Sequence, residues 1–372
     1  MKTLLFVFGT RPEAIKLCPL IHHLRLRHPF RVLVCVTAQH RSLLDQVLQV
    51  FDVHPDFDLN LMQPRQTLSE LTARMMTGLE PVLTGAQPDM VLVQGDTAST
   101  LCGSLAAFYQ RVPVAHVEAG LRTGDLAHPF PEEANRVLTG RLATLHFPPT
   151  EGAADNLRRE GVPASQITVT GNTGIDALLE IQRRLEDGSL PAVSWPWPDD
   201  GRKLVLVTSH RRESFGSGIE QICQALTELA HRPDTRIAFP VHPNPQVEQA
   251  VRIWLEGRER VHLLEPQPYV PFVDLMRRAH LILTDSGGVQ EEAPSLGKPV
   301  LVMREKTERP EAVEAGTSRL VGTSRQRIVE EASLLLDDTA DYERRSRMHN
   351  PYGDGRASER IGECLMRYFN SR

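Results

Sequence analysis

Three acidic side chains follow apolar, strand-like runs in the first half of the chain. Asp96 comes after the run 90–94, Glu118 comes after 112–117, and Glu132 opens a later helical pattern. Carboxylates that lie close together push at least one pKa upward, which lets an acid stay protonated near neutral pH. The three residues therefore predict acid–base chemistry at the ends of parallel strands.

Each of these carboxylates also has a purely structural interpretation. Asp96 is a common residue type for a helix cap. Glu118 could pair with Arg122, and Glu132 would interact favourably with the dipole of the helix that it opens. The catalytic interpretation depends on recurrence, because charged or hydrogen-bonding groups follow nearly every strand-like run, and loops that only turn do not require them.

The second half contains a glycine turn that suits a phosphate. The apolar run 281–284 leads to Ser286, Gly287 and Gly288, and a helical pattern follows. Glycines allow a close approach of the backbone, and the first N–H groups of a helix can bind an anion. Glu292 comes later in this helix, where its carboxylate could accept hydrogen bonds from a ribose. An ordinary tight turn between a strand and a helix is the alternative.

Basic and imidazole side chains follow other strand-like runs. Arg11 and Lys16 come after the first run, at 4–8, while His210 and His242 come within two residues of the ends of two runs of the second half. Because the net charge is −5, an anionic substrate would have to be bound by such locally placed groups. The structural alternatives are a satisfied polar histidine at 210 and a turn residue at 242.

Composition and motif content exclude several classes of protein. A chain of 372 residues with 41% hydrophobic content can form a large core, and its length favours two domains. A net charge of −5 gives no basic surface for nucleic acid. The five scattered cysteines contain no CxxC pair and predict reduced thiols in the cytoplasm. The N-terminal apolar run is too short for a signal peptide or a membrane span.

Cofactor motifs are missing from the sequence as well. The histidines are dispersed without HxH or HExxH spacing, so we expect no metal site. Gly287 and Gly288 do not complete a GxGxxG pattern, which argues against a nicotinamide cofactor. No P-loop or GxSxG elbow occurs either. We therefore expect a reaction without a cofactor.

Strand-like runs alternate with helical patterns along the chain, which predicts parallel sheets with helices on both faces. An irregular stretch at 184–202, rich in proline, glycine and acidic residues, separates two series of runs near a domain boundary. The predicted fold class is α/β, with two doubly wound, Rossmann-like domains that face a cleft at the carboxyl ends of their strands. The predicted strands span 4–8, 31–37, 90–94, 112–117, 145–148, 203–208, 237–241, 261–264, 281–284 and 300–302.

Distinct short motifs occur along nearly the whole chain. The first half contains GTRPEAIKLCPL from Gly9, TAQHRSLLDQVL from Thr37, QGDTAST from Gln94, HVEAGLRTGD from His116, PFPEEANR from Pro129 and GNTGIDAL from Gly171. The second half contains HRRESFG from His210, HPNP from His242, LTDSGGVQEEAPSLGKPVLVMR from Leu283, TERPEA from Thr307 and NPYGDG from Asn350. Together and in this order, the motifs resemble the non-hydrolysing UDP-N-acetylglucosamine 2-epimerases of bacteria.

The resemblance implies a fold of the glycosyltransferase-B type and usually a homodimer. The N-terminal domain, with the catalytic carboxylates, is expected at 1–170, with a C-terminal helix near 357–372 packed back on it. The UDP-binding domain is expected at 171–356. The implied reaction converts UDP-N-acetylglucosamine reversibly to UDP-N-acetylmannosamine, for cell-envelope polysaccharides. In this reaction UDP is eliminated to leave 2-acetamidoglucal and is then added back.

The resemblance also implies roles for particular residues. Asp96, Glu118 and Glu132 match the catalytic carboxylates, and His210 matches the active-site histidine. Our hypothesis is that Asp96 and Glu118 act at C2, while Glu132 supports the cationic ring or is the other proton donor.

Binding roles follow by the same comparison of motifs. The matched residues are Arg11 and Lys16 as the first-domain pair, Gln267 and Phe272 as the uracil site, Ser286, Gly287 and Gly288 as the diphosphate turn, Glu292 as the ribose carboxylate, and Arg309 as a further substrate-binding arginine. A second site, where substrate activates the enzymes of this family, matches the segments that contain Gln39, Arg65 and His242.

Three positions depart from the pattern of the family. Gln94 stands where histidine is frequent, Ser209 where glycine is frequent, and Gly174 where a larger apolar residue is usual. None removes a named functional group.

Three other functions share parts of the pattern: a glycosyltransferase, a hydrolysing epimerase that releases UDP, and a non-catalytic sensor of nucleotide sugars.

Overall fold

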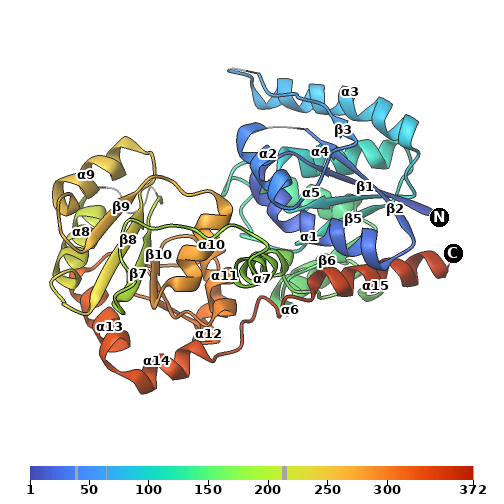
Figure 1. Ribbon diagram of the computed structural model, residues 1–372. Coiled ribbons are helices and arrows are strands. Elements are labelled where there is room, and N and C mark those ends of the chain that lie inside the picture. Colours follow the sequence, from blue (N-terminus) through green and yellow to red (C-terminus); the bar gives the residue numbers. More distant parts are fainter. Residues whose placement is uncertain (38–40, 64, 212–215, 372) are drawn as a thin grey trace. The chain divides into compact units, whose positions relative to one another are not determined.

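The computed structural model describes residues 1–37, 41–63, 65–211 and 216–371. It contains two compact units (Figure 1). Unit 1 comprises Met1–Ala177 and Gly353–Arg372, and unit 2 comprises Leu178–Tyr352. The chain leaves unit 1 within a helix and returns to it directly after Tyr352.

Unit 1 is built on a six-stranded parallel sheet with the order β3-β2-β1-β4-β5-β6. Its strands are β1 (Lys2–Phe8), β2 (Phe30–Val36), β3 (Phe57–Asp58), β4 (Met90–Gln94), β5 (Val114–Val117) and β6 (Leu145–Phe147). Its helices are α1 (Arg11–Arg27), α2 (Arg41–Val50), α3 (Leu68–Ala86), α4 (Ala98–Tyr109), α5 (Glu132–Leu142), α6 (Glu151–Arg159) and α15 (Ala357–Asn370), with a short 3-10 helix, η1, at Ala164–Gln166. Helix α7 (Thr173–Glu186) contains the boundary between the units.

Unit 2 repeats this arrangement with the order β12-β11-β10-β7-β8-β9. Its strands are β7 (Lys203–Thr208), β8 (Thr235–Pro240), β9 (Val261–Leu264), β10 (Leu281–Thr284), β11 (Val300–Val302) and β12 (Ser318–Leu320). Its helices are α8 (Ser217–Leu229), α9 (Pro245–Leu255), α10 (Tyr269–Arg278), α11 (Gly287–Glu292), α12 (Pro310–Glu314), α13 (Arg325–Asp337) and α14 (Thr339–Ser346), with the 3-10 helix η3 at Ala293–Leu296. Both units are Rossmann-like, which confirms the predicted α/β class with two doubly wound domains.

The core of each unit lies between its sheet and the covering helices. In β1, the residues Leu4–Phe8 are fully buried on both faces of the sheet, as expected for a central parallel strand. Leu17, Leu20 and Leu24 of α1 are likewise fully buried. Burial of each such side chain stabilises the fold by about 1.5–3 kcal/mol, so the sheet gives the loops at its carboxyl edge a rigid support.

The strand order reverses at one point in each sheet. In unit 1, β1 pairs with both β2 and β4, and in unit 2, β7 pairs with both β8 and β10. Ligands of doubly wound sheets bind beyond the carboxyl ends of the strands at such a point. The loops after β1, β4, β7 and β10 are therefore where functional side chains are expected.

Several segments differ from the sequence prediction. The ten predicted strands are present within a few residues, but β3 and β12 were not predicted. The stretch 184–202 was predicted to be irregular, whereas α7 continues to Glu186 and the irregular part begins after it, inside unit 2. There Trp195 and Trp197 stack with ring centroids 5.3 Å apart, and Trp195 donates a hydrogen bond to Asp274 at 2.8 Å.

Three further features concern the C-terminal helix, the thiols and the apolarity of the helices. Helix α15 lies beside α1 in unit 1 (Figure 1), and its Phe369 ring is 5.8 Å from the ring of Phe30 at the start of β2. All five cysteines are free, and four are buried while Cys364 is partly exposed. Among the described residues, none of the helices has the length and apolarity needed to cross a membrane.

Candidate active site

A carboxylate with two close donors lies at the carboxyl edge of the unit 1 sheet. Glu118 directly follows β5, and its Oε2 accepts hydrogen bonds from Lys16 Nζ and Gln94 Nε2, each at 2.5 Å. Lys16 comes from the second turn of α1, and Gln94 is the last residue of β4. The side chains of Glu118 and Lys16 are only 8% and 19% exposed. The ion pair therefore lies in a largely desolvated place, where charge interactions are stronger than in water.

The backbone of Glu118 has a conformation that side-chain-bearing residues seldom adopt. Its φ is +60°, in the left-handed region, which costs about 1–2 kcal/mol for a residue with a Cβ. The N–H groups of Glu118 and Ala119 both donate to the carbonyl of Phe147 in β6, at 3.0 and 3.3 Å. Strain of this kind tends to occur at functional sites, where surrounding bonds maintain it.

Asp96 lies in the turn after β4, next to this group. Its Oδ2 is 3.6 Å from Nη1 of Arg136 on α5. Burial raises the pKa of Asp96 to about 6, the charges of Glu118 and Glu132 add to the rise, and Arg136 and Lys16 oppose it. A carboxyl group with such a pKa can give or take a proton near neutrality. The structure thus places Asp96 where the charges of the other two predicted carboxylates influence it.

Glu132 and Arg11 each begin a helix in unit 1. Glu132 is the first residue of α5, Arg11 is the first residue of α1, and both side chains are partly exposed. Helix α1 begins there because the Thr10 hydroxyl and the Glu13 carboxylate cap each other's backbone N–H groups. Burial raises the pKa of Glu13, whose Oε2 also accepts from the N–H of Gly9 at 3.1 Å.

In unit 2, His210 is held by a buried aspartate from the neighbouring strand. His210 follows β7 and Asp285 follows β10, on the two sides of the point where the strand order reverses. Nδ1 of His210 is 3.1 Å from Oδ1 of Asp285, whose side chain is fully buried. Oδ2 accepts from Ser209 Oγ at 3.0 Å and from the N–H groups of His210 and Arg211 at 2.8 and 2.9 Å.

These bonds decide the charge of Asp285 and the orientation of the imidazole. Burial alone would raise the pKa of Asp285, but the hydrogen bonds from His210 and from the N–H of Arg211 outweigh it and lower the pKa. An ionised Asp285 can only accept, so Nδ1 of His210 carries a proton. The Nε2 atom is therefore the imidazole nitrogen that is available to a ligand.

The glycine turn follows Asp285 directly. The Ser286 N–H donates to Thr284 Oγ1 at 2.9 Å, and α11 begins at Gly287. The guanidinium of Arg309 is 3.7 Å from the place where a Cβ of Gly287 would lie. Arg309 also forms an ion pair with the buried Glu291 of α11. An arginine beside a glycine turn is suited to a diphosphate, and Glu292 is the last residue of the same helix.

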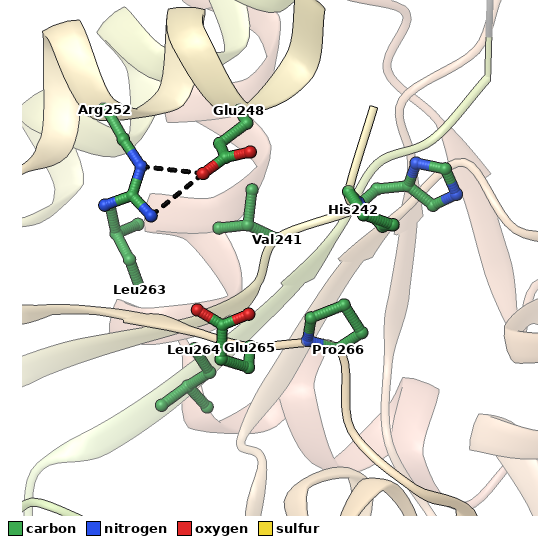
Figure 2. A pocket seen from close by; sticks show the side chains of 9 residues that line it. Val241, His242, Glu248, Arg252, Leu263, Leu264, Glu265 and Pro266 are labelled. Atoms are coloured by element: carbon green, nitrogen blue, oxygen red, sulfur yellow. Dashed lines mark hydrogen bonds and ion pairs between the residues drawn. The ribbon is translucent and has the colours of Figure 1, made fainter. Parts of the chain in front are cut away.

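The expected uracil residues come from the β9–α10 loop and from α10. Gln267 donates to the carbonyl of Glu265 at 2.6 Å, and Phe272 lies in the first turn of α10, partly exposed. Pro266, which precedes Gln267, and His242, which follows β8, line an open hollow at the carboxyl ends of β8 and β9. Figure 2 shows His242 on one side of this hollow and an ion pair of Arg252 and Glu248 on the other. The ring centroids of His242 and His210 are 5.8 Å apart.

The residues expected at the second substrate site are described only in part. Gln39 lies outside the described residues. Arg65 is exposed in unit 1, where it lines a shallow hollow with Glu70 and Arg74 of α3. His242 is exposed in unit 2, and burial together with the charge of His210 lowers its pKa.

Sequence reasoning missed three residues that contact the predicted ones. Gln94 was noted only as a departure, yet it donates to Glu118. Arg136 and Asp285 lie within quoted motifs, but no role was assigned to them, and they contact Asp96 and His210. Their position next to a predicted site residue was the available signal: each is the last residue of a strand or lies within four residues of a named site residue.

Comparison with known proteins gives a consistent result. The family model described as UDP-N-acetylglucosamine 2-epimerase matches residues 22–366. The chain belongs to this family. The protein named UDP-N-acetylglucosamine 2-epimerase from Escherichia coli (strain K12) is 59% identical over 366 residues, which cover 97% of each chain. The predicted family and the expectation of an enzyme are thereby confirmed.

Solved structures agree with the fold of this epimerase-family chain. The crystal structure of UDP-GlcNAc 2-epimerase from Neisseria meningitidis bound to UDP-GlcNAc is 49% identical, with a TM-score of 0.89, over 99% of this chain and 100% of that chain. The glycotransferase of kitacinnamycin is 14% identical, with a TM-score of 0.67, over 98% of each chain. The second likeness concerns the fold alone and agrees with the glycosyltransferase-B type.

Proposed function

We propose that this protein interconverts UDP-N-acetylglucosamine and UDP-N-acetylmannosamine by eliminating UDP and adding it back. Unit 1 supplies the acid–base groups, and unit 2 binds the UDP moiety. The observation that supports this most strongly is the group formed by Asp96, Glu118 and Lys16, because it contains a carboxyl group whose pKa is raised to about 6. Proton transfer needs such a group, whereas binding alone does not.

The first step breaks the bond between C1 of the sugar and the β-phosphate oxygen, and the electron pair leaves with UDP. The hydrogen on C2 is not adjacent to a carbonyl, so direct abstraction without elimination would have no enolate to stabilise it. Negative charge grows on the β-phosphate as the bond breaks. The N–H groups of the Ser286–Gly288 turn and the guanidinium of Arg309 are suited to stabilise it, and Nε2 of His210 can donate as well when the ring carries both protons.

The second requirement is a base for the C2 proton. Loss of that proton forms the C1–C2 double bond of 2-acetamidoglucal. We assign the proton transfers at C2 to Asp96 and Glu118, and the support of the cationic ring, or the delivery of a proton to the other face, to Glu132. A proton then adds to the opposite face of C2, and the β-phosphate oxygen of UDP attacks C1. No redox step is involved, so a cofactor is not needed.

Proton NMR in heavy water tests this function. Incubation with UDP-N-acetylglucosamine should replace the C2 hydrogen by deuterium and form UDP-N-acetylmannosamine, without any acceptor. Exchange is expected because the abstracted proton equilibrates with solvent during the lifetime of the glucal. Turnover only with an acceptor would indicate a glycosyltransferase, and UDP released in proportion to product would indicate a hydrolysing epimerase. Binding without exchange would indicate a sensor and would overturn the proposal.

Family membership supports three wider elements of the proposal. The protein would act as a cytoplasmic homodimer, would supply mannosamine-derived sugars for envelope polysaccharides, and would be activated by its own substrate. Sedimentation at micromolar concentration should give the mass of a dimer, and initial rates should rise sigmoidally with substrate. A monomer with hyperbolic kinetics would contradict the first and third elements.

A further inference from the structure

The turn that presents Asp96 is held by side chains from three other elements. His116 of β5 bonds through Nε2 to the carbonyl of Gly95 at 2.7 Å. Asn135 of α5 donates from Nδ2 to the carbonyl of Asp96 at 2.9 Å. Thr97 donates from its hydroxyl to Oε1 of Glu13 at 2.8 Å. Three successive residues of one turn are therefore fixed by separate long-range contacts.

The protonation state of His116 can be derived from its surroundings. The side chain is fully buried, and burial lowers its pKa to about 3. The imidazole is therefore neutral at physiological pH. A carbonyl oxygen only accepts, so the single ring proton is on Nε2 and is donated to Gly95. A neutral donor of this kind cannot exchange protons with a substrate in the working pH range.

Gly95 explains why the turn needs such support. Its φ is +71°, and no atom lies within 4 Å of the place where its Cβ would be. The space beside this position is thus open, so the turn is held through its backbone bonds, which include the Gly95 N–H to the carbonyl of Val117 at 3.0 Å, and a glycine that loses such a bond can rotate at little cost. Loss of an anchor would let the Asp96 carboxyl change its distance from Arg136, Lys16, Glu118 and Glu132, the charges that influence it.

We propose that His116 and Asn135 are positioning residues that hold the Asp96 carboxyl in place for proton transfer. This inference rests on the function proposed above for Asp96. Asn135 lies one turn after Glu132 on α5, so its bond also fixes the distance between Glu132 and Asp96. A displacement of about 1 Å at a reacting group can cost on the order of 100-fold in rate.

The sheet contains a matched control for His116. His146 of β6 lies directly opposite His116 in the register of the two strands. It is equally buried, and burial lowers its pKa to about 4. Its hydrogen bond goes to the backbone of Ala143, away from the Asp96 turn. Replacing either imidazole removes the same group from the same sheet, but only one replacement affects the turn.

The test compares His116→Phe, His116→Gln and His146→Phe in the full-length protein, with UDP-N-acetylglucosamine as substrate. We expect kcat to fall about 10- to 100-fold in His116→Phe with KM changed less than about threefold. We expect the wild-type pH profile of kcat to show an inflection near pH 6 from Asp96, and this inflection should move toward the value of an ordinary carboxyl group in His116→Phe. His116→Gln, whose amide can donate, should recover part of kcat, and His146→Phe should keep kcat within about threefold.

Equal loss of kcat in the two phenylalanine variants would overturn the inference, as would an unchanged pH profile in His116→Phe. If His116→Phe does not fold, Asn135→Ala replaces it, with Thr139→Ala as the control from the same buried face of α5. The activities of the wild type and of Asp96→Asn distinguish a failure of the proposed catalytic role of Asp96 from a failure of the positioning role of His116. An active Asp96→Asn variant would refute the proposed role of Asp96, whereas an inactive one beside an active His116→Phe would refute only the positioning.

Discussion

Asp285→Asn isolates the effect of one buried charge on His210. The carboxylate accepts three loop donors on Oδ2 at 2.8–3.0 Å and lies 3.1 Å from Nδ1 of His210 through Oδ1. An asparagine has one accepting oxygen. That oxygen must stay with the three loop donors, because an NH₂ group there would oppose all of them. The NH₂ group then faces Nδ1, which must become an acceptor, so a proton can remain on the ring only at Nε2.

The expected loss follows from removal of the Asp285 charge. A hydrogen bond that involves a charged group, such as the one between His210 and Asp285, contributes about 1.5–3 kcal/mol, and one between neutral groups contributes about 1 kcal/mol. The transition state should lose about 1–2 kcal/mol, which corresponds to about a 5- to 30-fold drop in kcat/KM. Nitrogen NMR of the imidazole should show that Nδ1 is protonated in the wild type and unprotonated in the variant.

Ser209→Gly is the matched control for Asp285→Asn. It removes the Ser209 bond to Oδ2, at 3.0 Å, and leaves the pairing of Asp285 with His210 intact. We expect kcat/KM within about threefold of the wild type, because Oδ2 keeps the two N–H donors of His210 and Arg211 and the charge that faces Nδ1 is unchanged. The reasoning would be refuted if Asp285→Asn kept kcat/KM within about threefold, or if Ser209→Gly lost as much activity.

Three other predictions concern residues on both units. Asp96→Asn should lower the rate about 10²–10⁴-fold. Asp96→Asn should also raise the melting temperature above that of the wild type at pH 8 but not at pH 4. In the wild type, the stabilisation from an Asp96 pKa raised to about 6 is present below the pKa of the unfolded chain and is lost as pH rises through about 6, whereas asparagine stays neutral at both pH values. Equal melting temperatures of the two proteins at pH 8 would contradict this. Gln94→His places an imidazole beside Glu118 and should add an inflection between about pH 6 and 7 to the pH profile of kcat/KM. A pH profile like that of the wild type would contradict this prediction. Arg309→Ala should weaken UDP binding about tenfold or more in calorimetry, since a hydrogen bond to a charged group contributes about 1.5–3 kcal/mol, and unchanged affinity would exclude Arg309 from the diphosphate site.

The strands that were predicted are the continuous apolar ones. Runs such as Leu281–Thr284 are fully buried, and burial on both faces leaves a clear pattern in the sequence. The two missed strands lack this pattern: Phe57–Asp58 has only two residues, and Ser318–Leu320 contains an exposed arginine. Both are at the edges of their sheets, where one side has no neighbouring strand to bury it.

The limits of prediction at the site have a different cause. Residues just beyond predicted strands, such as Asp96 and His210, could be named because the fold class itself puts strand ends together. Their partners come from other elements: Asp285 is 75 positions from His210, and Asn135 is 39 positions from Asp96. Such pairs depend on the strand order and on side-chain direction. The left-handed backbone of Glu118 is likewise accompanied by bonds to β6 that no local pattern indicates.

A crystal structure with UDP and 2-acetamidoglucal tests the central claim most directly. The measured quantity is the distance from C2 of the glucal to the nearest carboxylate oxygen, with the β-phosphate located at the same time. We predict the β-phosphate against Ser286–Gly288, and C2 within about 3–3.5 Å of Asp96 or Glu118, as reacting atoms require. A β-phosphate bound away from that turn, or a C2 atom beyond the reach of both carboxylates, would contradict the account.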